Sequence, residues 1–365
     1  MSWKLVIFTF LSVVEGFSSC PSMCTCHWTQ NNLTVDCGSA GLNFIPLDVP
    51  MDVNILKLRN NSIQLESNSF QKTPDLQILH LQMNNLHFLP NDLFAWVPQL
   101  RGLHLYNNKL SHLPENIFSN VPKLEYLLLN KNQLYNVSDQ LFVPLKKLKT
   151  LVLSHNRLQV VSPRIFLGLE SLNTLSLAFN QLSILPESLF ENLHNLRICA
   201  LNNNRLESLP DTVVQGLRNL TWITLANNIL RELPPKLFSH TPLVKLFLNS
   251  NKLEVLPTGI LHSLKDLTYL DLRNNQLELV PNGIFEPLVN LNSIRLDQNP
   301  WRCDYGNSYL RCWIKSHQNI INSRSINKPE SVTCHSPEHL AGNAMVNVTA
   351  GEMGECQTLK LISPH

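Results

Sequence analysis

The cysteines carry the most evident chemistry in this sequence, and they gather near the two ends of the chain. The protein has 365 residues and nine cysteines, of which two groups of four could form disulfides or bind zinc. Neither group has the paired CxxC spacing of a zinc site, so we expect disulfides, which form in exported proteins. The eight residues are Cys20, Cys24, Cys26, Cys37, Cys303, Cys312, Cys334 and Cys356.

Catalytic motifs are absent from the sequence. It contains no nucleophile elbow, no phosphate-binding loop and no HExxH segment. We therefore expect that the protein is not an enzyme and uses no cofactor. The formal net charge is +2 and only 15% of the residues are charged. This balance argues against a protein that binds nucleic acid or a membrane surface.

The first 18 residues have the features of a cleaved secretory signal peptide. Lys4 precedes an apolar run over residues 5–14, and the small residues Gly16 and Ser18 follow it. The run is too short to cross a bilayer of about 30 Å. The sequence has no second apolar run of about 20 residues, and the tail over 357–365 is too short for a lipid-anchor signal. We expect a secreted, extracellular protein without a membrane-inserted segment.

Internal repeats must position any functional residues. A segment with Leu76, Leu79, Leu81 and Asn84 returns along the chain, and asparagine marks each copy at intervals of 23 or 24 residues. Such regular spacing indicates a solenoid. The marking asparagines are Asn61, Asn84, Asn108, Asn132, Asn156, Asn180, Asn204, Asn228, Asn251, Asn275 and Asn299.

Each repeat is expected to contain one short strand whose leucines point inward, because stacked repeats bury a continuous apolar core. The asparagine amide is then needed to satisfy backbone groups of adjacent turns. A phenylalanine follows ten residues after most of these asparagines, which predicts a stack of rings on the convex side. The convex segments are expected to be short helical turns or extended stretches. The phenylalanines are Phe94, Phe118, Phe142, Phe166, Phe190, Phe238 and Phe285.

The pattern LxxLxLxxNxL resembles the leucine-rich-repeat family over almost all of the chain that follows the signal. It is similar to capped, secreted glycoproteins such as leucine-rich alpha-2-glycoprotein, the beta-type phospholipase A2 inhibitors and the regulatory subunit of carboxypeptidase N. The resemblance implies an α/β solenoid, a curved horseshoe with a parallel concave sheet of about eleven strands. We expect a signal peptide (1–18), an amino-terminal cap (19–50), repeats (51–298), a carboxy-terminal cap (299–356) and a tail (357–365).

Both cysteine groups resemble the caps of extracellular family members. That resemblance pairs Cys20 with Cys26 and Cys24 with Cys37. The segment NPWRCDYGNSYLRCWI departs from the family pattern, because Tyr305 stands where a second cysteine is expected and Cys312 lies seven residues later. We prefer a shifted bridge between Cys312 and Cys356 beside one between Cys303 and Cys334.

Cys199 replaces an inward leucine in the segment LRICAL. A small buried residue is the simpler interpretation, because free cysteine packs as a hydrophobic side chain. A reactive or interchain thiol is the alternative.

Strand alternation assigns the third, fifth and seventh positions of LxxLxLxx to the concave face. We expect aromatic residues there to bind a protein partner, because exposed rings on a rigid sheet often anchor interfaces. Cross-strand stacking that only stabilises the sheet is the alternative. The aromatic residues are Tyr106, Tyr126, Trp222, Phe247 and Tyr269. Small residues lie between the two groups, at Ser154, Ser176, Ala178, Ala200 and Ala226.

The polar side chains of the concave face lead to two further predictions. His80 and His104 are neighbours in one row, about 5 Å apart, and could sense pH or bind a metal. No third ligand is evident, so we expect no metal site. Near the other end we expect two ion pairs between adjacent strands, Asp271 with Arg295 and Arg273 with Asp297.

Five N-x-[ST] sequons predict glycans outside the three outward rows of the concave face. They begin at Asn32, Asn60, Asn136, Asn219 and Asn347. The sequence thus indicates a secreted glycoprotein that binds an extracellular protein through its concave face and acts as an inhibitor or regulator. Two alternatives stay open: an antigen receptor of the variable lymphocyte type, and a stabilising subunit of an exported enzyme. The oligomeric state is not indicated.

Overall fold

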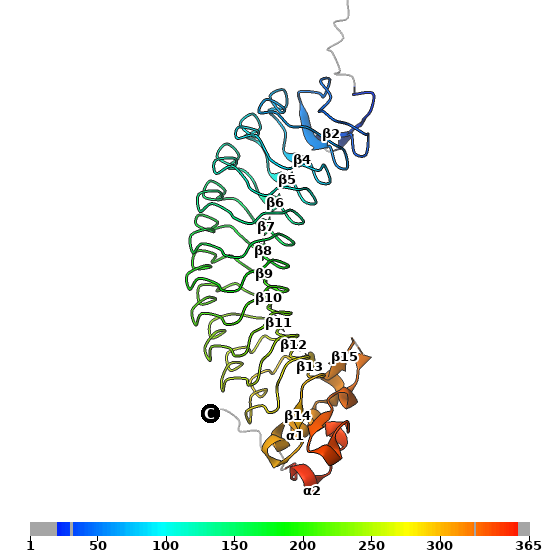
Figure 1. The fold of residues 1–365 in the computed structure, drawn as a ribbon, viewed down its shortest axis with the longest axis vertical. Coiled ribbons are helices and arrows are strands. Elements are labelled where there is room, and N and C mark those ends of the chain that lie inside the picture. Colours follow the sequence, from blue (N-terminus) through cyan, green and yellow to red (C-terminus); the bar gives the residue numbers. More distant parts are fainter. Residues whose placement is uncertain (1–19, 30–31, 325, 357–365) are drawn as a thin grey trace, which may run out of the picture.

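The computed structural model describes residues 20–29, 32–324 and 326–356. These residues form a curved solenoid whose strands follow one another along the inner side of the arc (Figure 1). The expected signal peptide and tail lie outside the described residues. Within the described residues, no helix is long and apolar enough to cross a membrane.

One sheet of 13 strands runs the length of the solenoid in sequence order. Strands β1 and β2 form an antiparallel hairpin, and every later neighbour pairs in parallel. The eleven strands from β3 to β13 carry the repeats, which agrees with the expected parallel sheet. The strands are β1 (Thr25–Thr29), β2 (Asn32–Asp36), β3 (Val53–Lys57), β4 (Ile78–His80), β5 (Gly102–His104), β6 (Tyr126–Leu128), β7 (Thr150–Val152), β8 (Thr174–Ser176), β9 (Ile198–Ala200), β10 (Trp222–Thr224), β11 (Lys245–Phe247), β12 (Tyr269–Asp271) and β13 (Ser293–Arg295).

The leucines of the repeat pattern build the core behind this sheet. Leu79, Leu103 and Leu127 are fully buried, and so are their equivalents in later repeats. Opposite the sheet, the chain makes successive turns, with bonds such as Val97 N–H to Phe94 O. The rings of Phe94 and Phe118 stack there with centroids 6.3 Å apart, which is the expected aromatic stack.

Each marking asparagine ties two neighbouring repeats together. Asn156 Nδ2 donates to Leu129 O of the preceding repeat (3.0 Å) and to Leu153 O of its own (2.9 Å). Its Oδ1 accepts from Leu134 N–H (3.0 Å). The side chain is buried, so these bonds replace the water that the backbone groups have lost. The asparagines therefore hold the solenoid together and are not available as binding groups.

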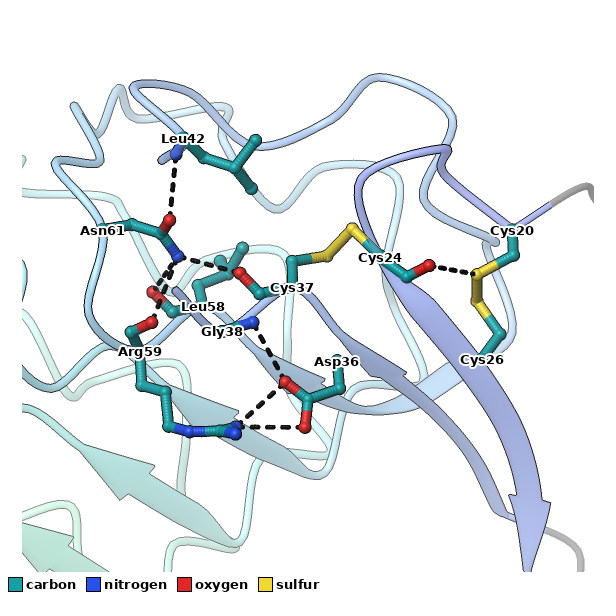
Figure 2. Close-up of a disulfide and its surroundings, with 10 residues drawn as sticks. All are labelled: Cys20, Cys24, Cys26, Asp36, Cys37, Gly38, Leu42, Leu58, Arg59 and Asn61. Atoms are coloured by element: carbon teal, nitrogen blue, oxygen red, sulfur yellow. Dashed lines mark hydrogen bonds and ion pairs between the residues drawn. A yellow bond between two sulfur atoms is a disulfide. The ribbon is translucent and has the colours of Figure 1, made fainter. Parts of the chain in front are cut away.

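The amino-terminal cap is the β1–β2 hairpin with the bridges Cys20–Cys26 and Cys24–Cys37. Asn61 connects it to the first repeat, because its Nδ2 donates to Cys37 O and its Oδ1 accepts from Leu42 N–H (Figure 2). These pairings are the ones that the family resemblance implies.

The carboxy-terminal cap contains the bridges Cys303–Cys334 and Cys312–Cys356, as the sequence favours. Tyr305, which replaces the family cysteine, donates its hydroxyl hydrogen to Gly351 O (3.0 Å). The buried Arg311 donates to Val348 O and Gly354 O and fixes the last segment. The cap elements are β14 (Trp301–Arg302), η1 (Tyr305–Asn307), α1 (Ser308–Ser316), η2 (Gln318–Ile320), β15 (Asn322–Ser323), β16 (Ile326–Asn327), η3 (Pro329–Ser331), β17 (Cys334–Ser336), η4 (Glu338–Leu340), η5 (Met345–Asn347) and α2 (Ala350–Met353).

Cys199 lies in β9 with its side chain in the core, and it is fully buried. It forms no disulfide, and burial raises the pKa of its thiol to about 12. A thiol that is buried and protonated is a poor nucleophile, so the packing interpretation describes it well.

Candidate functional site

Three aromatic side chains meet on the concave face near the carboxy-terminal end of the sheet. The register pairs Trp222 with Lys245 and Lys245 with Tyr269, while Phe247 occupies the next outward row. The ring centroids of Trp222 and Phe247 are 5.5 Å apart, and those of Phe247 and Tyr269 are 4.9 Å apart. We call Trp222, Phe247 and Tyr269 the aromatic cluster. All three rings are half-buried, so each keeps a surface that a partner can cover.

Tyr106 and Tyr126 lie apart from this cluster. Tyr126 begins β6 with 46% of its surface exposed, and Tyr106 follows β5 with its ring 6.3 Å from that of His104. Four strand steps separate β6 from β10, a distance of about 19 Å. The five expected aromatic residues therefore form two groups on one face. The short side chains of Ser176 and Ala200 lie in one outward row of the middle strands β8 and β9, and the exposed Ile198 lies in the row beside them.

A buried carboxylate lies beside the aromatic cluster. Asp271 is 1% exposed, and burial raises the pKa of its carboxyl group although two arginines face it. Its Oδ2 lies 3.3 Å from Arg273 Nε and 3.6 Å from Arg295 Nη1. The guanidinium of Arg295 also lies over the Tyr269 ring, 5.8 Å from its centroid. The contact with Arg295 therefore helps to fix the orientation of the Tyr269 ring.

The expected pair of Arg273 with Asp297 is wrong. The described residues show Arg273 bound to Asp271 of its own repeat, while Asp297 Oδ2 accepts from Ser323 Oγ of the cap (3.2 Å). Asp271 is closer to Arg273 than Asp297 is, and it is more deeply buried, so both arginines pair with Asp271. The pair of Asp271 with Arg295 is present as expected.

The two histidines are neighbours, as expected, with ring centroids 4.2 Å apart. Burial, together with the nearby positive charges of His104, Lys57 and Arg59, lowers the pKa of His80 to about 4. Burial also lowers the pKa of His104. The described part of the chain contains no group of three or more His, Cys, Asp or Glu side chains that could hold a metal ion.

The histidine pair predicts a pH dependence of stability. The folded-state pKa of His80 is about 4, below the ordinary value of 6.5, so the unfolded chain binds this proton more tightly. Above pH 6.5, His80 is neutral in both states and does not reduce the free energy of unfolding. As the pH drops from 6.5 towards 4, protonation of His80 in the unfolded chain lowers the free energy of unfolding. Denaturant midpoints across this window should fall for the wild type and fall less for His80→Gln. The exposed His112→Gln should behave like the wild type, and an equal fall in all three would contradict the assignment.

A surface pair that the sequence analysis missed lies at the rim of the concave face. His155 and Phe179 stack with centroids 4.0 Å apart and planes 9° apart. Each directly precedes a marking asparagine, in a turn with φ of 54°. The sequence could have indicated this pair, because the position directly before the marking asparagine is itself asparagine in several other repeats but carries a ring side chain in these two. Phe179 is 43% exposed.

Comparison with known proteins gives repeat matches along most of the chain. The family model described as Leucine rich repeat matches residues 74–134, 98–158, 146–206, 195–245 and 241–300. Leucine-rich repeat-containing protein 3 of Mus musculus is 40% identical over 68 residues, which are 18% of this chain and 26% of the relative. Human platelet glycoprotein IX is 35% identical over 83 residues, 22% of this chain and 46% of the relative. The chain thus spans less than half the length of these curated relatives.

The solved structures include a chain of similar fold over nearly the whole length. It belongs to the octameric complex of Latrophilin 3 (Lec, Olf), Unc5D (Ig, Ig2, TSP1) and FLRT2 (LRR). The TM-score is 0.76 at 27% sequence identity, and the match covers 90% of this chain and 98% of the other. Because the family model spans residues 74–300, more than half of the 365 residues, the chain belongs to the leucine-rich-repeat family.

Proposed function

We propose that this protein is a secreted glycoprotein that binds an extracellular protein partner through its concave face. The observation that carries the proposal is the aromatic cluster of Trp222, Phe247 and Tyr269, whose rings touch across β10, β11 and β12. Rings that are large, rigid and half-exposed contribute much of the affinity in protein interfaces. They lose little conformational entropy on binding, because the sheet already holds them in place.

The folding of the repeats does not require these rings. The core of β10 to β12 is filled by the inward side chains Ile223, Leu246 and Leu270, which are almost fully buried. The outward row could carry polar residues, as Lys245 shows between Trp222 and Tyr269. Apolar rings in an outward row therefore favour a binding role over a purely structural one.

Export is supported by the disulfides and by the placement of the sequons. Four bridges close the two caps, and such bridges persist in oxidising compartments. Asn60, Asn136, Asn219 and Asn347 are exposed, and none lies in an outward row of the concave face. Glycans at these sites would leave the aromatic cluster open. The similar chain comes from a complex of several different proteins, which is consistent with a protein-binding role.

We further propose that binding inhibits or regulates the partner, as in the secreted family members that the sequence resembles. An antigen receptor and a stabilising enzyme subunit remain the alternatives. The subunit alternative predicts a constitutive complex on size-exclusion chromatography of native material. The regulatory role predicts free protein alongside the complex.

Affinity capture tests the proposal. Full-length glycosylated protein serves as bait in its source fluid, and a Trp222→Ala/Phe247→Ala variant serves as the matched bait. Mass spectrometry should identify a protein that the wild type retains and the variant loses. Equal recovery on both baits would place the contact elsewhere on the surface.

A further inference from the structure

A cluster of cations lies where the chain enters three successive strands. Arg101 precedes β5, Lys123 precedes β6, and Lys146, Lys147 and Lys149 precede β7. We call these five residues the basic flank, because they border the sheet on one side of the solenoid. Lys146, Lys147 and Lys149 come from the segment LKKLKT, and all three are exposed.

The backbone places these cations in a row along the solenoid. Glu125 N–H donates to Arg101 O, and Lys149 N–H donates to Glu125 O, so the three residues occupy equivalent positions in adjacent repeats. The side chain of Ser171 in the next repeat donates from its Oγ to Lys146 O (2.7 Å). Adjacent repeats are about 5 Å apart at the sheet, so Lys123 and Lys147, which are 24 residues apart, lie in adjacent repeats, while Arg101 and Lys149 lie two repeats apart with Glu125 between them.

Nearby carboxylates neutralise only part of this charge. The partly covered Glu125 binds Arg101 (3.0 Å) and Lys149 (2.6 Å). Lys123 donates to the neutral Gln99, and the described residues contain no ion pair of Lys146 or Lys147. Glu125 and Glu170 are the acidic residues of the neighbouring row positions, so five cations face two carboxylates. This local excess of three charges exceeds the net charge of +2 carried by the whole chain.

We propose that the basic flank binds a linear sulfated polysaccharide. A short lysine-rich run on an exposed surface is the pattern of polyanion sites such as heparin patches. Lysine acts as a point charge that suits sulfate groups without a fixed docking geometry. The five cations span three repeats, about 10 Å at the sheet, along the direction of the solenoid.

Two neighbouring features fit this ligand. Tyr126, which is 46% exposed, is an aromatic neighbour of these cations, and a single tyrosine with a polar hydroxyl is a weak anchor in a lipid bilayer. The sequon residue Asn219 lies in the row of Lys147, three repeats further along, with its Nδ2 bound to His194 O. A glycan there would leave about 14 Å of flank free.

The test measures binding of a heparin oligosaccharide to the full-length glycosylated protein at about 0.15 M salt. Lys146→Gln/Lys147→Gln should raise the Kd about tenfold, because the salt-sensitive contacts of a polyanion scale with the number of cations. The matched control is Lys131→Gln/Arg157→Gln, which removes two exposed charges from the opposite flank and should change the Kd by less than about twofold.

The possible outcomes separate this proposal from others. The proposal is supported if only Lys146→Gln/Lys147→Gln loses heparin binding. It is also supported if Trp222→Ala/Phe247→Ala, which changes the concave face, binds heparin as the wild type does. No measurable heparin binding by the wild type overturns the proposal. An equal loss of heparin binding in Lys146→Gln/Lys147→Gln and in the Lys131→Gln/Arg157→Gln control also overturns it. Binding of phosphatidylserine vesicles but not heparin, with the same sensitivity to Lys146 and Lys147, would assign the flank to a lipid surface instead.

Discussion

Replacement of Trp222 and Phe247 by alanine is expected to weaken partner binding by at least about 2 kcal/mol, or about 30-fold in Kd. The two rings touch each other with centroids 5.5 Å apart, and Phe247 also touches Tyr269. Their removal would dismantle the cluster and leave only Tyr269 of the three anchors. Titration calorimetry or surface plasmon resonance with the captured partner measures the loss.

The same double variant should keep most of its stability. The rings are half-buried and outside the core, so the cost is limited to ring–ring contact, less than about 1.5 kcal/mol. The matched control is Phe88→Ala/Tyr135→Ala, because both side chains are exposed and lie outside the concave face. Lost stability with unchanged affinity would mean that the cluster is only cross-strand packing, and that the partner binds elsewhere.

Replacement of Asn156 by alanine is expected to destabilise the solenoid by about 1–3 kcal/mol. The change leaves Leu129 O, Leu153 O and Leu134 N–H without the amide that bonds them, in a buried position. Guanidinium unfolding followed by circular dichroism measures the shift of the midpoint.

The control for Asn156 is Asn173→Ala. Asn173 is also in the repeat region, but the described residues show no hydrogen bond of its side-chain amide. It should unfold at nearly the wild-type midpoint. Equal midpoints for both variants and the wild type would contradict the role assigned to the asparagines.

Much of this architecture could be predicted, because the repeat period fixes both the fold and the outward rows. Once Asn156 and its equivalents set the register, strand alternation places Trp222, Phe247 and Tyr269 on one face. The cap pairings followed from family resemblance, and the position of Cys312 indicated the shifted bridge. Eleven strands therefore agree with eleven asparagines.

Other features depend on side-chain conformations that a repeat pattern does not encode. The pattern placed Arg273 beside Asp297, but the depth of Asp271 decides which acceptor the arginine reaches. The stacking of His155 on Phe179 requires the left-handed turn before each marking asparagine. The basic flank was hidden as well, because the net charge of +2 averages over the whole chain and conceals a local excess.

The central claim, that the concave face binds the partner, is tested most directly by placing a glycan on it. Thr174→Asn creates the sequon N-L-S in β8 with one substitution, between the two aromatic groups. Val160→Asn creates the sequon N-V-S at an exposed position outside that face. Occupancy is verified by the mass lost on glycosidase treatment. Affinity for the captured partner should be abolished by the glycan at position 174 and unchanged by the glycan at position 160. Full affinity with an occupied site at position 174 would contradict the account.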